Sequence, residues 1–321
     1  MATYKGIKGF NIQTVSSDPP APFVGEVWYN STSTTVKYFA VLTAAWATGG
    51  NLTTGRSDFH GAGTQTAALV FGGTAPPSKN ATEEYNGTAW TNGGNLGTGR
   101  VSLSGAGTQT AGLAFMGSPP TEGLNSTEEY NGSAWTGGGN MTTARQGGAG
   151  AGIQTAALAI SGYTQPEPQY GTNVEEYNGS SWTNGGAYPT ATRWLCGLGT
   201  QTAALAFGGT SLGVPNNNTT FEYNGSSWTA GGNMGTGRLR LVGAGLQTAG
   251  LAMGGANPNS VLTESYDGSS WTSTTNMLTG QGYAAGCGTQ TLALNAGGEG
   301  SPALTQEFTG GGPTTFTVGT D

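Results

Sequence analysis

Short apolar runs bounded by glycine alternate with short polar hairpins along most of the chain. Residues 61–73, GAGTQTAALVFGG, hold two apolar stretches on either side of a Thr-Gln-Thr segment. Runs of this length between glycines are typical of strands that are buried on both faces. Residues 82–90, TEEYNGTAW, place two further short strands around Asn-Gly, the dipeptide favoured by two-residue type I′ hairpin turns. The block therefore predicts four short strands in an up-and-down order.

The block occurs six times, at intervals of 43 to 47 residues. Its glutamine recurs at Gln65, Gln109, Gln154, Gln201, Gln247 and Gln290. A tryptophan follows the block's tyrosine by five residues, at Trp90, Trp135, Trp182, Trp228 and Trp271, and Phe308 takes the tyrosine position in the sixth block. An arginine opens the first five blocks, at Arg56, Arg100, Arg145, Arg193 and Arg238. We interpret these side chains as structural, with tryptophan covering the gap between neighbouring sheets and arginine beginning each inner strand.

Six four-stranded blocks of this length predict an all-β fold, a six-bladed β-propeller with a short N-terminal β-hairpin extension. Trp46 lies in the pattern of a fourth strand with no inner strands before it, whereas the last block ends its third strand at Phe308. We therefore predict that the Trp46 strand completes the last blade. The alternative is a strand around Phe316, which would leave Trp46 outside the ring.

The order of motifs within each block carries a family resemblance. Arginine, an apolar strand ending in Gly-Gly, Glu-Tyr and then tryptophan follow one another over residues 46–308. This order resembles the kelch repeat, and the resemblance implies a kelch-like propeller. The chain departs from the kelch pattern in its GTQTA phrase and in the second and third blocks, where residues 116–117 and 161–162 replace Gly-Gly.

A different pattern precedes the repeats. Residues 24–41, VGEVWYNSTSTTVKYFAV, predict a hairpin around NSTST. The hairpin resembles one found in bacteriophage virion proteins, notably tail fibres and other appendage proteins, and the low-charge Gly/Thr/Asn repeat is similar to propeller proteins of marine phages. The resemblance implies an attachment segment at residues 1–45 that contacts other virion proteins, a propeller at 46–309 and a C-terminal tail at 310–321.

Composition narrows the class of protein. The chain has 60 glycines among 321 residues, 8% charged residues and 9% aromatic residues, which favours ordered turns and close backbone contacts over disorder. The net charge of −7 argues against nucleic-acid binding. No apolar run is long enough for a membrane helix, and the first residues lack the apolar core of a secretory signal. We expect a protein made in the host cytoplasm that reaches the outside by assembly into a virion.

The residues that carry most enzyme chemistry are sparse or repeated. The single histidine, His60, cannot build a multi-histidine metal site, and we expect a structural role for it. Cys196 and Cys287 fall in different blocks, so we expect two buried free thiols. Acid pairs such as Glu83 and Glu84 recur in step with the repeat, which favours structural Arg–Glu pairs between blades over catalysis. We therefore predict no catalytic residues, no metal and no cofactor.

Binding is expected on the face that carries the variable loops between second and third strands. Loops on a rigid scaffold are common recognition sites, and these include aromatic and amide side chains able to stack on sugars or hydrogen-bond hydroxyls. The candidate residues are Tyr163, Gln165, Tyr170, Asn216, Asn217 and Asn218. The alternative is that these loops are solvated and bind nothing.

The function that follows is that of a non-enzymatic virion structural protein, a displayed fibre, decoration or adhesion propeller. Its expected partners are virion proteins and a host-surface glycan or receptor, and a homo-oligomer is compatible with this role. The alternatives are a glycan-processing enzyme on a propeller scaffold and an intracellular kelch-type scaffold.

Overall fold

The computed structural model describes residues 12–74, 79–119, 123–164, 169–256 and 258–318. The chain divides into two compact units, which we call unit 1 (residues 1–45 and 310–321) and unit 2 (residues 46–309). The described residues form strands and turns and no helix, so the prediction of an all-β protein is confirmed.

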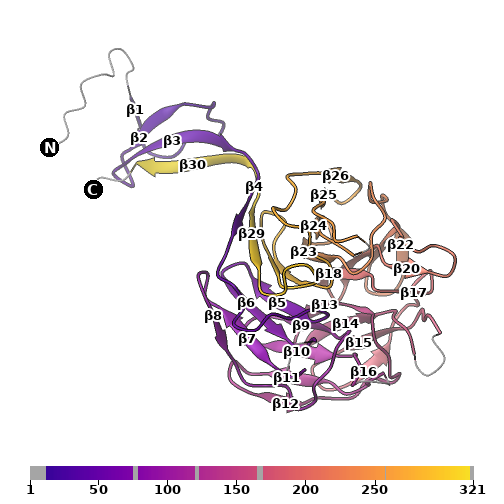
Figure 1. The fold of residues 1–321 in the computed structure, drawn as a ribbon. Coiled ribbons are helices and arrows are strands. Elements are labelled where there is room, and N and C mark those ends of the chain that lie inside the picture. Colours follow the sequence, from indigo (N-terminus) through magenta and orange to yellow (C-terminus); the bar gives the residue numbers. More distant parts are fainter. Residues whose placement is uncertain (1–11, 75–78, 120–122, 165–168, 257, 319–321) are drawn as a thin grey trace. The chain divides into compact units, whose positions relative to one another are not determined.

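Within the described residues, unit 2 holds six four-stranded sheets (Figure 1). Five of them each come from one block of the sequence, and the sixth takes its fourth strand from before the first block. Sheets 1 to 3 consist of β5 (His60–Thr64), β6 (Ala67–Phe71), β7 (Thr82–Tyr85) and β8 (Trp90–Asn92); β9 (Ser104–Gly107), β10 (Gly112–Phe115), β11 (Glu128–Tyr130) and β12 (Trp135–Gly137); and β13 (Ala149–Ile153), β14 (Ala156–Ile160), β15 (Val174–Tyr177) and β16 (Trp182–Asn184). Sheets 4 and 5 consist of β18 (Cys196–Thr200), β19 (Ala203–Phe207), β21 (Thr220–Tyr223) and β22 (Trp228–Ala230); and β23 (Val242–Leu246), β24 (Ala249–Met253), β25 (Thr263–Tyr266) and β26 (Trp271–Ser273). Sheet 6 consists of β27 (Ala285–Gly288), β28 (Leu292–Ala296), β29 (Thr305–Thr309) and β4 (Ala45–Thr48). A two-stranded sheet consists of β17 (Thr192–Arg193), which precedes β18 in the chain, and β20 (Thr210–Ser211), which lies between β19 and β21.

The first strands of successive sheets lie side by side, and β27 of sheet 6 lies beside β5 of sheet 1. In Figure 1 the labels of β5, β9, β13, β18 and β23 gather at the middle of unit 2. Glycine is required where these strands crowd: a Cβ on Gly150 would lie 2.4 Å from the carbonyl oxygen of Gly105 on the neighbouring strand. The arrangement is consistent with a β-propeller.

The outer edge of each sheet is held by an aromatic pair. Tyr85 faces Trp90 across the hairpin of sheet 1, with ring centroids 4.8 Å apart. Sheets 2 to 5 repeat this pair, and in sheet 6 the pair is Phe308 and Trp46, 5.1 Å apart. The Trp46 strand therefore occupies the fourth-strand place in sheet 6.

The hairpin between these strands differs from the predicted two-residue turn. Tyr85 pairs with Trp90, which leaves four residues in the loop, and only Gly87 among them has a positive φ, +92°. The side-chain oxygen of Asn86 accepts hydrogen bonds from the backbone N–H groups of Thr88 and Ala89, at 3.0 and 2.9 Å. Because the asparagine side chain closes the turn itself, a type I′ backbone is not needed.

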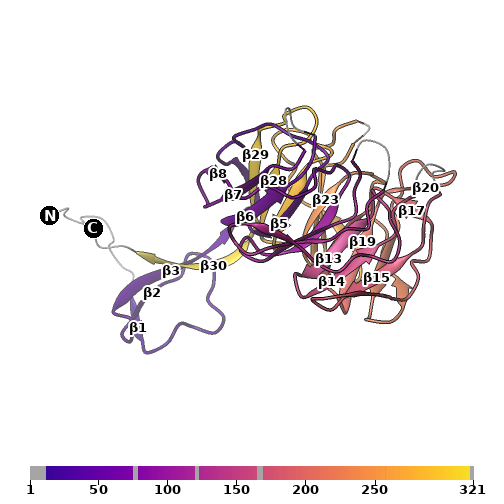
Figure 2. The same ribbon diagram turned by 90° about the horizontal axis from the view of Figure 1, so that it is seen from below.

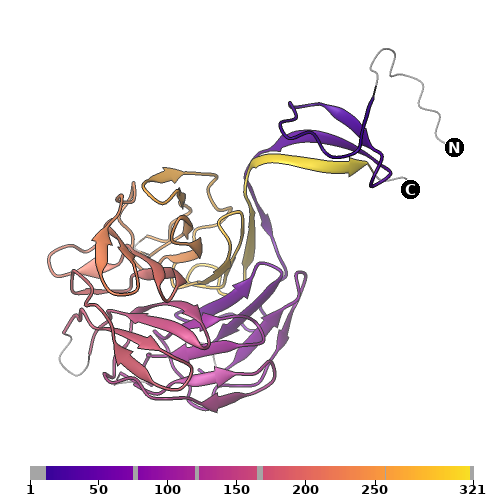
Figure 3. The same ribbon diagram turned by 180° about the vertical axis from the view of Figure 1, so that it is seen from behind.

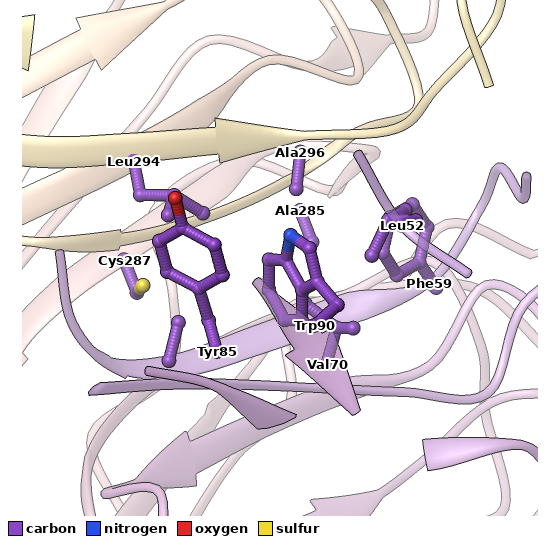
Figure 4. Close-up of a cluster of buried hydrophobic side chains, with 10 residues drawn as sticks. Leu52, Phe59, Val70, Tyr85, Trp90, Ala285, Cys287, Leu294 and Ala296 are labelled. Carbon is purple, nitrogen blue, oxygen red and sulfur yellow. The ribbon is translucent and has the colours of Figure 1, made fainter. Parts of the chain in front are cut away.

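Tryptophan covers the gap between neighbouring sheets, as predicted. The indole N–H of Trp90 donates to Thr305 of sheet 6, and that of Trp135 donates to Thr82 of sheet 1, at 2.9 and 3.0 Å. Figure 4 shows Trp90 and Tyr85 of sheet 1 extending toward Leu294 and Ala296 of sheet 6. These four side chains belong to one buried apolar cluster, so sheets 1 and 6 share a packed interface.

The repeated glutamine also joins neighbouring sheets, a role that the sequence analysis did not foresee. The amide of Gln109, in the first turn of sheet 2, donates to the backbone oxygens of Ala68 and Tyr85 in sheet 1, at 3.0 and 2.7 Å. Every block repeats this clasp, and Gln65 of sheet 1 donates to Ala293 and Phe308 of sheet 6. The glutamine of the GTQTA phrase is therefore explained by contacts between sheets.

Unit 1 is one sheet in the order β1-β2-β3-β30. It consists of β1 (Gln13–Val15), β2 (Val27–Asn30), β3 (Thr35–Leu42) and β30 (Gly312–Val318). The predicted hairpin is present as β2 and β3. The expectation of a C-terminal tail at 310–321 is wrong for residues 312–318, because β30, which holds Phe316, pairs with β3 along its whole length (Figures 2 and 3).

The W-Y-N…K motif of the hairpin holds one carboxylate. Trp28 and Asn30 donate side-chain hydrogen bonds to Oδ1 of Asp18, at 3.0 and 2.8 Å, and Lys37 lies 2.7 Å from its Oδ2. The hydrogen bond from Lys37 is the largest cause that lowers the pKa of Asp18 to about 2. The motif therefore has a structural explanation within the sheet.

Candidate functional site

Most of the repeated charged side chains are used inside the sheets. Arg100 and Arg238 form buried ion pairs with Glu128 and Glu264, at 2.5 and 2.7 Å. Two further pairs of the same kind join Arg56 to Glu83 and Arg145 to Glu175. Each pair lies within one block, so the expectation that such pairs would connect different blades is wrong: the arginine precedes the first strand of the same sheet whose third strand carries the acid. Burial lowers the pKa of each arginine, and the neighbouring carboxylate acts in the opposite direction.

The second acid of each pair connects neighbouring sheets. The hydroxyl of Tyr130 donates to Glu84 of the preceding sheet at 2.5 Å. Burial, followed by this hydrogen bond, raises the pKa of Tyr130 to about 12. Sheet 6 has Phe308 at the tyrosine position, and Phe308 has no hydroxyl to donate. The matching second-acid position in sheet 5 holds Ser265 instead of a glutamate, so no carboxylate there needs that donor. The acid pairs thus have structural partners, which agrees with the structural role expected from their repetition.

Arg193 was predicted to open the fourth block, but this prediction is wrong by one residue, because Thr192 holds the opening position. The backbone oxygen of each opening residue accepts a hydrogen bond from the second residue of the Gly-Gly position, as in Gly73 to Arg100. In the fourth block that acceptor is Thr192, which receives the N–H of Gly162 at 3.0 Å. Phe221 stands at the acid position of the same sheet, so neither member of the usual ion pair is charged. Arg193 is left free for other contacts.

Six residues that follow the opening position by two form a ring of backbone hydrogen bonds. They are Asp58, Ser102, Gly147, Trp194, Arg240 and Tyr283. The N–H of each donates to the carbonyl of the one before it, and the N–H of Asp58 donates to Tyr283, over distances of 2.6 to 3.2 Å. All six have positive φ angles between 50° and 63°. Left-handed backbone favours glycine, yet five of the six carry side chains.

The side chains of this ring form a mixed aromatic and charged cluster. Arg240 lies between two rings, with its guanidinium carbon 4.0 Å from the Trp194 ring centre and 3.9 Å from the Tyr283 ring centre. Its Nη1 also pairs with Asp58 at 2.8 Å, and Asp58 accepts a hydrogen bond from Ser102 at 2.7 Å. The carboxylate of Asp58 is thus engaged by a cation and a hydroxyl.

Arg193 extends the cluster to the other side of Trp194. Its guanidinium carbon lies 3.8 Å from the Trp194 ring centre, 4.7 Å from that of Tyr170 and 4.9 Å from that of Tyr163. We call the side chains of Arg193, Trp194, Arg240 and Tyr283, with Tyr163 and Tyr170, the cationic–aromatic cluster. Two residues predicted for binding, Tyr163 and Tyr170, therefore lie here, with Tyr163 buried and Tyr170 half-buried.

The other predicted binding residues have different places. Gln165 lies outside the described residues. Asn217 is buried, and its backbone bonds Gly209 and Arg238; the side-chain amide of Asn218 donates to the backbone of Met234 at 3.1 Å. Asn216 is exposed. The structure thus assigns Asn217 and Asn218 to holding their loop.

The ring residues also line a cavity of about 200 Å³, together with the glycine- and alanine-rich first strands. His60 lines the same cavity, and burial lowers its pKa to about 4, while a hydrogen bond to the backbone of Gly105 acts in the opposite direction. The imidazole is therefore neutral at neutral pH.

Trp194, Arg240, Tyr283 and Asp58 were missed by the sequence analysis. A signal was present: when the six blocks are superposed on their glutamines and Gly-Gly pairs, the second residue after the opening position differs in every block while its surroundings repeat. A position that varies within a constant frame is where one repeat protein can differ from another.

No protein-family model matches the sequence, and no curated protein matches it either. In the part of the chain that the structure describes, no group of three or more His, Cys, Asp or Glu side chains could hold a metal ion. The same residues include no helix of the length and apolarity needed to cross a membrane. Cys196 and Cys287 are free and buried, as expected, and burial raises the pKa of each thiol to about 12.

Proposed function

We propose that the chain is a non-enzymatic recognition protein built on a closed, six-bladed, kelch-like propeller. Closure is supported by the cyclic series of six backbone hydrogen bonds, which returns from Tyr283 to Asp58. It is also supported by the Gln65 clasp onto sheet 6 and by the place of the Trp46 strand at the edge of that sheet.

The single observation that carries a recognition role is the contrast between two sets of polar side chains. The polar side chains that repeat make ion pairs and hydrogen bonds within and between sheets. The side chains that differ from block to block lie together at the ring of backbone hydrogen bonds. Binding proteins place their specific groups on a constant scaffold in this way. Asp58, the one carboxylate of the ring, is already paired with Arg240 and bonded by Ser102, which favours binding over general-base chemistry at this ring.

The proposed setting is a bacteriophage virion, on which the propeller is displayed as a fibre, decoration or adhesion protein. This setting is supported by the resemblance of residues 24–41 to hairpins of virion appendage proteins. Unit 1 combines that hairpin with the C-terminal strand β30, so its sheet is the proposed attachment surface for other virion proteins. The proposed target of unit 2 is a glycan or receptor on the host surface.

The test uses the full chain and the source particle. Antibodies against the full chain should label intact virions in electron microscopy, and the purified chain should bind host cells without releasing reducing ends from their polysaccharides. Label confined to the host cytosol would contradict the virion setting and favour an intracellular scaffold. Release of sugar products would instead favour a glycan-processing enzyme.

A further inference from the structure

We propose that the cationic–aromatic cluster binds the carboxylate of an acidic sugar, such as a uronic acid residue of a surface polysaccharide. This inference rests on the proposed recognition function and deepens it by naming the chemical class of ligand.

Arg193 supplies a positive charge that no described carboxylate pairs with. The chain has six arginines, and five of them form ion pairs with carboxylates. Arg193 has no ion-pair partner among the residues that the structure describes. In a chain with net charge −7 this half-buried cation is a distinct feature, and the charge attracts an anion to this place.

The packing of Arg193 restricts how a ligand can reach it. Trp194, Tyr163 and Tyr170 lie within 5 Å of the guanidinium carbon, measured to their ring centres. Trp194 has the shortest of these distances, 3.8 Å, and a ring stacked on one face of a guanidinium leaves the N–H groups at its edge for hydrogen bonds; Tyr163, at 81° to Trp194, does not stack in the same way. A planar carboxylate matches that edge with two parallel bonds.

Three buried donors of the cluster lack an acceptor among the described residues, a state that Nε of Arg145 and Nε of Arg238 share outside it. Nε of Arg193, Nε1 of Trp194 and Nε of Arg240 are buried and have no acceptor among the described residues. An unmatched buried donor is destabilising. A ligand rich in oxygen acceptors therefore suits the cluster, and the hydroxyls of a sugar are such acceptors.

The positive φ angles of the ring residues indicate that their side chains are kept at the expense of backbone strain. Trp194, Arg240 and Tyr283 have φ angles of 56°, 51° and 59°, a region that is strained for a non-glycine residue. Gly147 occupies the equivalent position of the third block and satisfies the same hydrogen-bonded ring. Large side chains are thus not required by the ring, and here they hold the two guanidinium groups in place.

Nucleic acid and other extended polyanions fit less well. The cluster holds two cations, one of which Asp58 already neutralises, whereas binding along a phosphate backbone needs many. One carboxylate beside stacked rings corresponds to one acidic sugar residue.

The test measures binding of the full chain to a galacturonate oligosaccharide by titration calorimetry, with a neutral glucan and a sulfated glucan as comparison probes. We expect binding of the galacturonate probe, weaker binding of the sulfated glucan and none of the neutral one. Arg193→Gln should weaken galacturonate binding about 10- to 100-fold, because charge-assisted bidentate bonds contribute about 1.5–3 kcal/mol. Arg193→Lys should also weaken it, since an ammonium lacks the planar fork.

Lys79→Gln is the matched control, because it removes one positive charge from another loop between second and third strands. It should leave galacturonate binding unchanged, and thermal unfolding should show that each variant is folded. Equal loss in Lys79→Gln and Arg193→Gln, unaltered binding by Arg193→Gln, absence of galacturonate binding, or preference for the sulfated glucan would each overturn the inference.

Host-cell adhesion separates this inference from the proposed function. If the wild-type chain adheres to host cells and Arg193→Gln adheres equally, the recognition function stands and the cluster is not its site. If the wild-type chain binds galacturonate but no host cell, the site stands and the host-recognition role fails.

Discussion

Replacing Gln65 by alanine tests whether sheets 1 and 6 are locked together. The Gln65 amide lies in the turn between β5 and β6 and donates to the backbone oxygens of Ala293 and Phe308, at 3.0 and 2.7 Å. These acceptors are more than 220 residues away in the sequence. The same clasp joins every other neighbouring pair of sheets, so Gln65 makes at the junction of the chain ends the contact that its counterparts make elsewhere.

The expected cost can be worked from these two bonds. A neutral hydrogen bond contributes about 1 kcal/mol net, and removing the amide leaves two carbonyls without their donors. We expect Gln65→Ala to lower the free energy of unfolding by about 2–3 kcal/mol. For a unit of this size, the loss corresponds to a fall in the midpoint of thermal unfolding of about 4–5 °C.

The assay is equilibrium unfolding of the full chain in urea, followed by tryptophan fluorescence, with Gln201→Ala as the matched variant. Gln201 makes the same two bonds, at 3.0 and 2.7 Å, between sheets 3 and 4. In a closed ring the two variants should lose the same stability. A large loss in Gln201→Ala with less than about 0.5 kcal/mol in Gln65→Ala, the range of a neutral surface change, would refute closure at this junction.

Three further predictions concern buried titratable groups. Arg145→Gln should destabilise the fold by about 3–5 kcal/mol, because it leaves Glu175 charged and buried. In urea unfolding, the double variant Arg145→Gln/Glu175→Gln should recover most of the lost free energy of unfolding. A double variant as unstable as the single one would refute the explanation. The folded-state pKa of His60 is about 4, below the ordinary value of 6.5. Between these two pH values the unfolded chain binds a proton that the folded chain does not. The free energy of unfolding should therefore fall as pH drops from 6.5 to 4, by up to about 3 kcal/mol. His60→Gln should remove that part of the pH dependence, and an unchanged slope would contradict it. Burial, followed by the hydrogen bond to Glu307, raises the pKa of Tyr85 to about 12, so the stability that its neutral form contributes should persist below pH 10 and disappear as pH rises through 12. The difference between ultraviolet titrations of the wild type and Tyr85→Phe should show a group that ionises near 12. Ionisation near 10 would contradict the prediction.

The scaffold was largely predictable because its signals are local and repeated. Apolar runs between glycines gave the inner strands, and the constant separation of Tyr85 and Trp90 marked the outer hairpin. Trp46 could be matched to a fourth strand because the count of strand types was one short in the last block. Repetition also indicated that Glu83 and Glu84 are structural.

Errors arose where one residue of register or a long-range contact decided the outcome. Arg193 lies one place beyond the series, and only the backbone bond from Gly162 to Thr192 reveals the shift. The strand 312–318 has no repeat to mark it and forms by pairing with β3, far away in the sequence. The Asn86 turn was misjudged because a side-chain hydrogen bond replaced the expected backbone geometry.

By itself the sequence determined the repeated strands and the order of their structural side chains, because glycine, tryptophan and strand-length apolar runs act over short distances and recur with the repeat. The tertiary structure alone decided the cationic–aromatic cluster. Its ring residues lie more than 40 positions apart, follow no pattern among themselves, and meet because the first strands lie side by side and bring the same backbone position of every block into one ring of hydrogen bonds. A group of side chains that depends on such convergence has no local signature, since each member is an ordinary residue until the ring of hydrogen bonds places it beside the others.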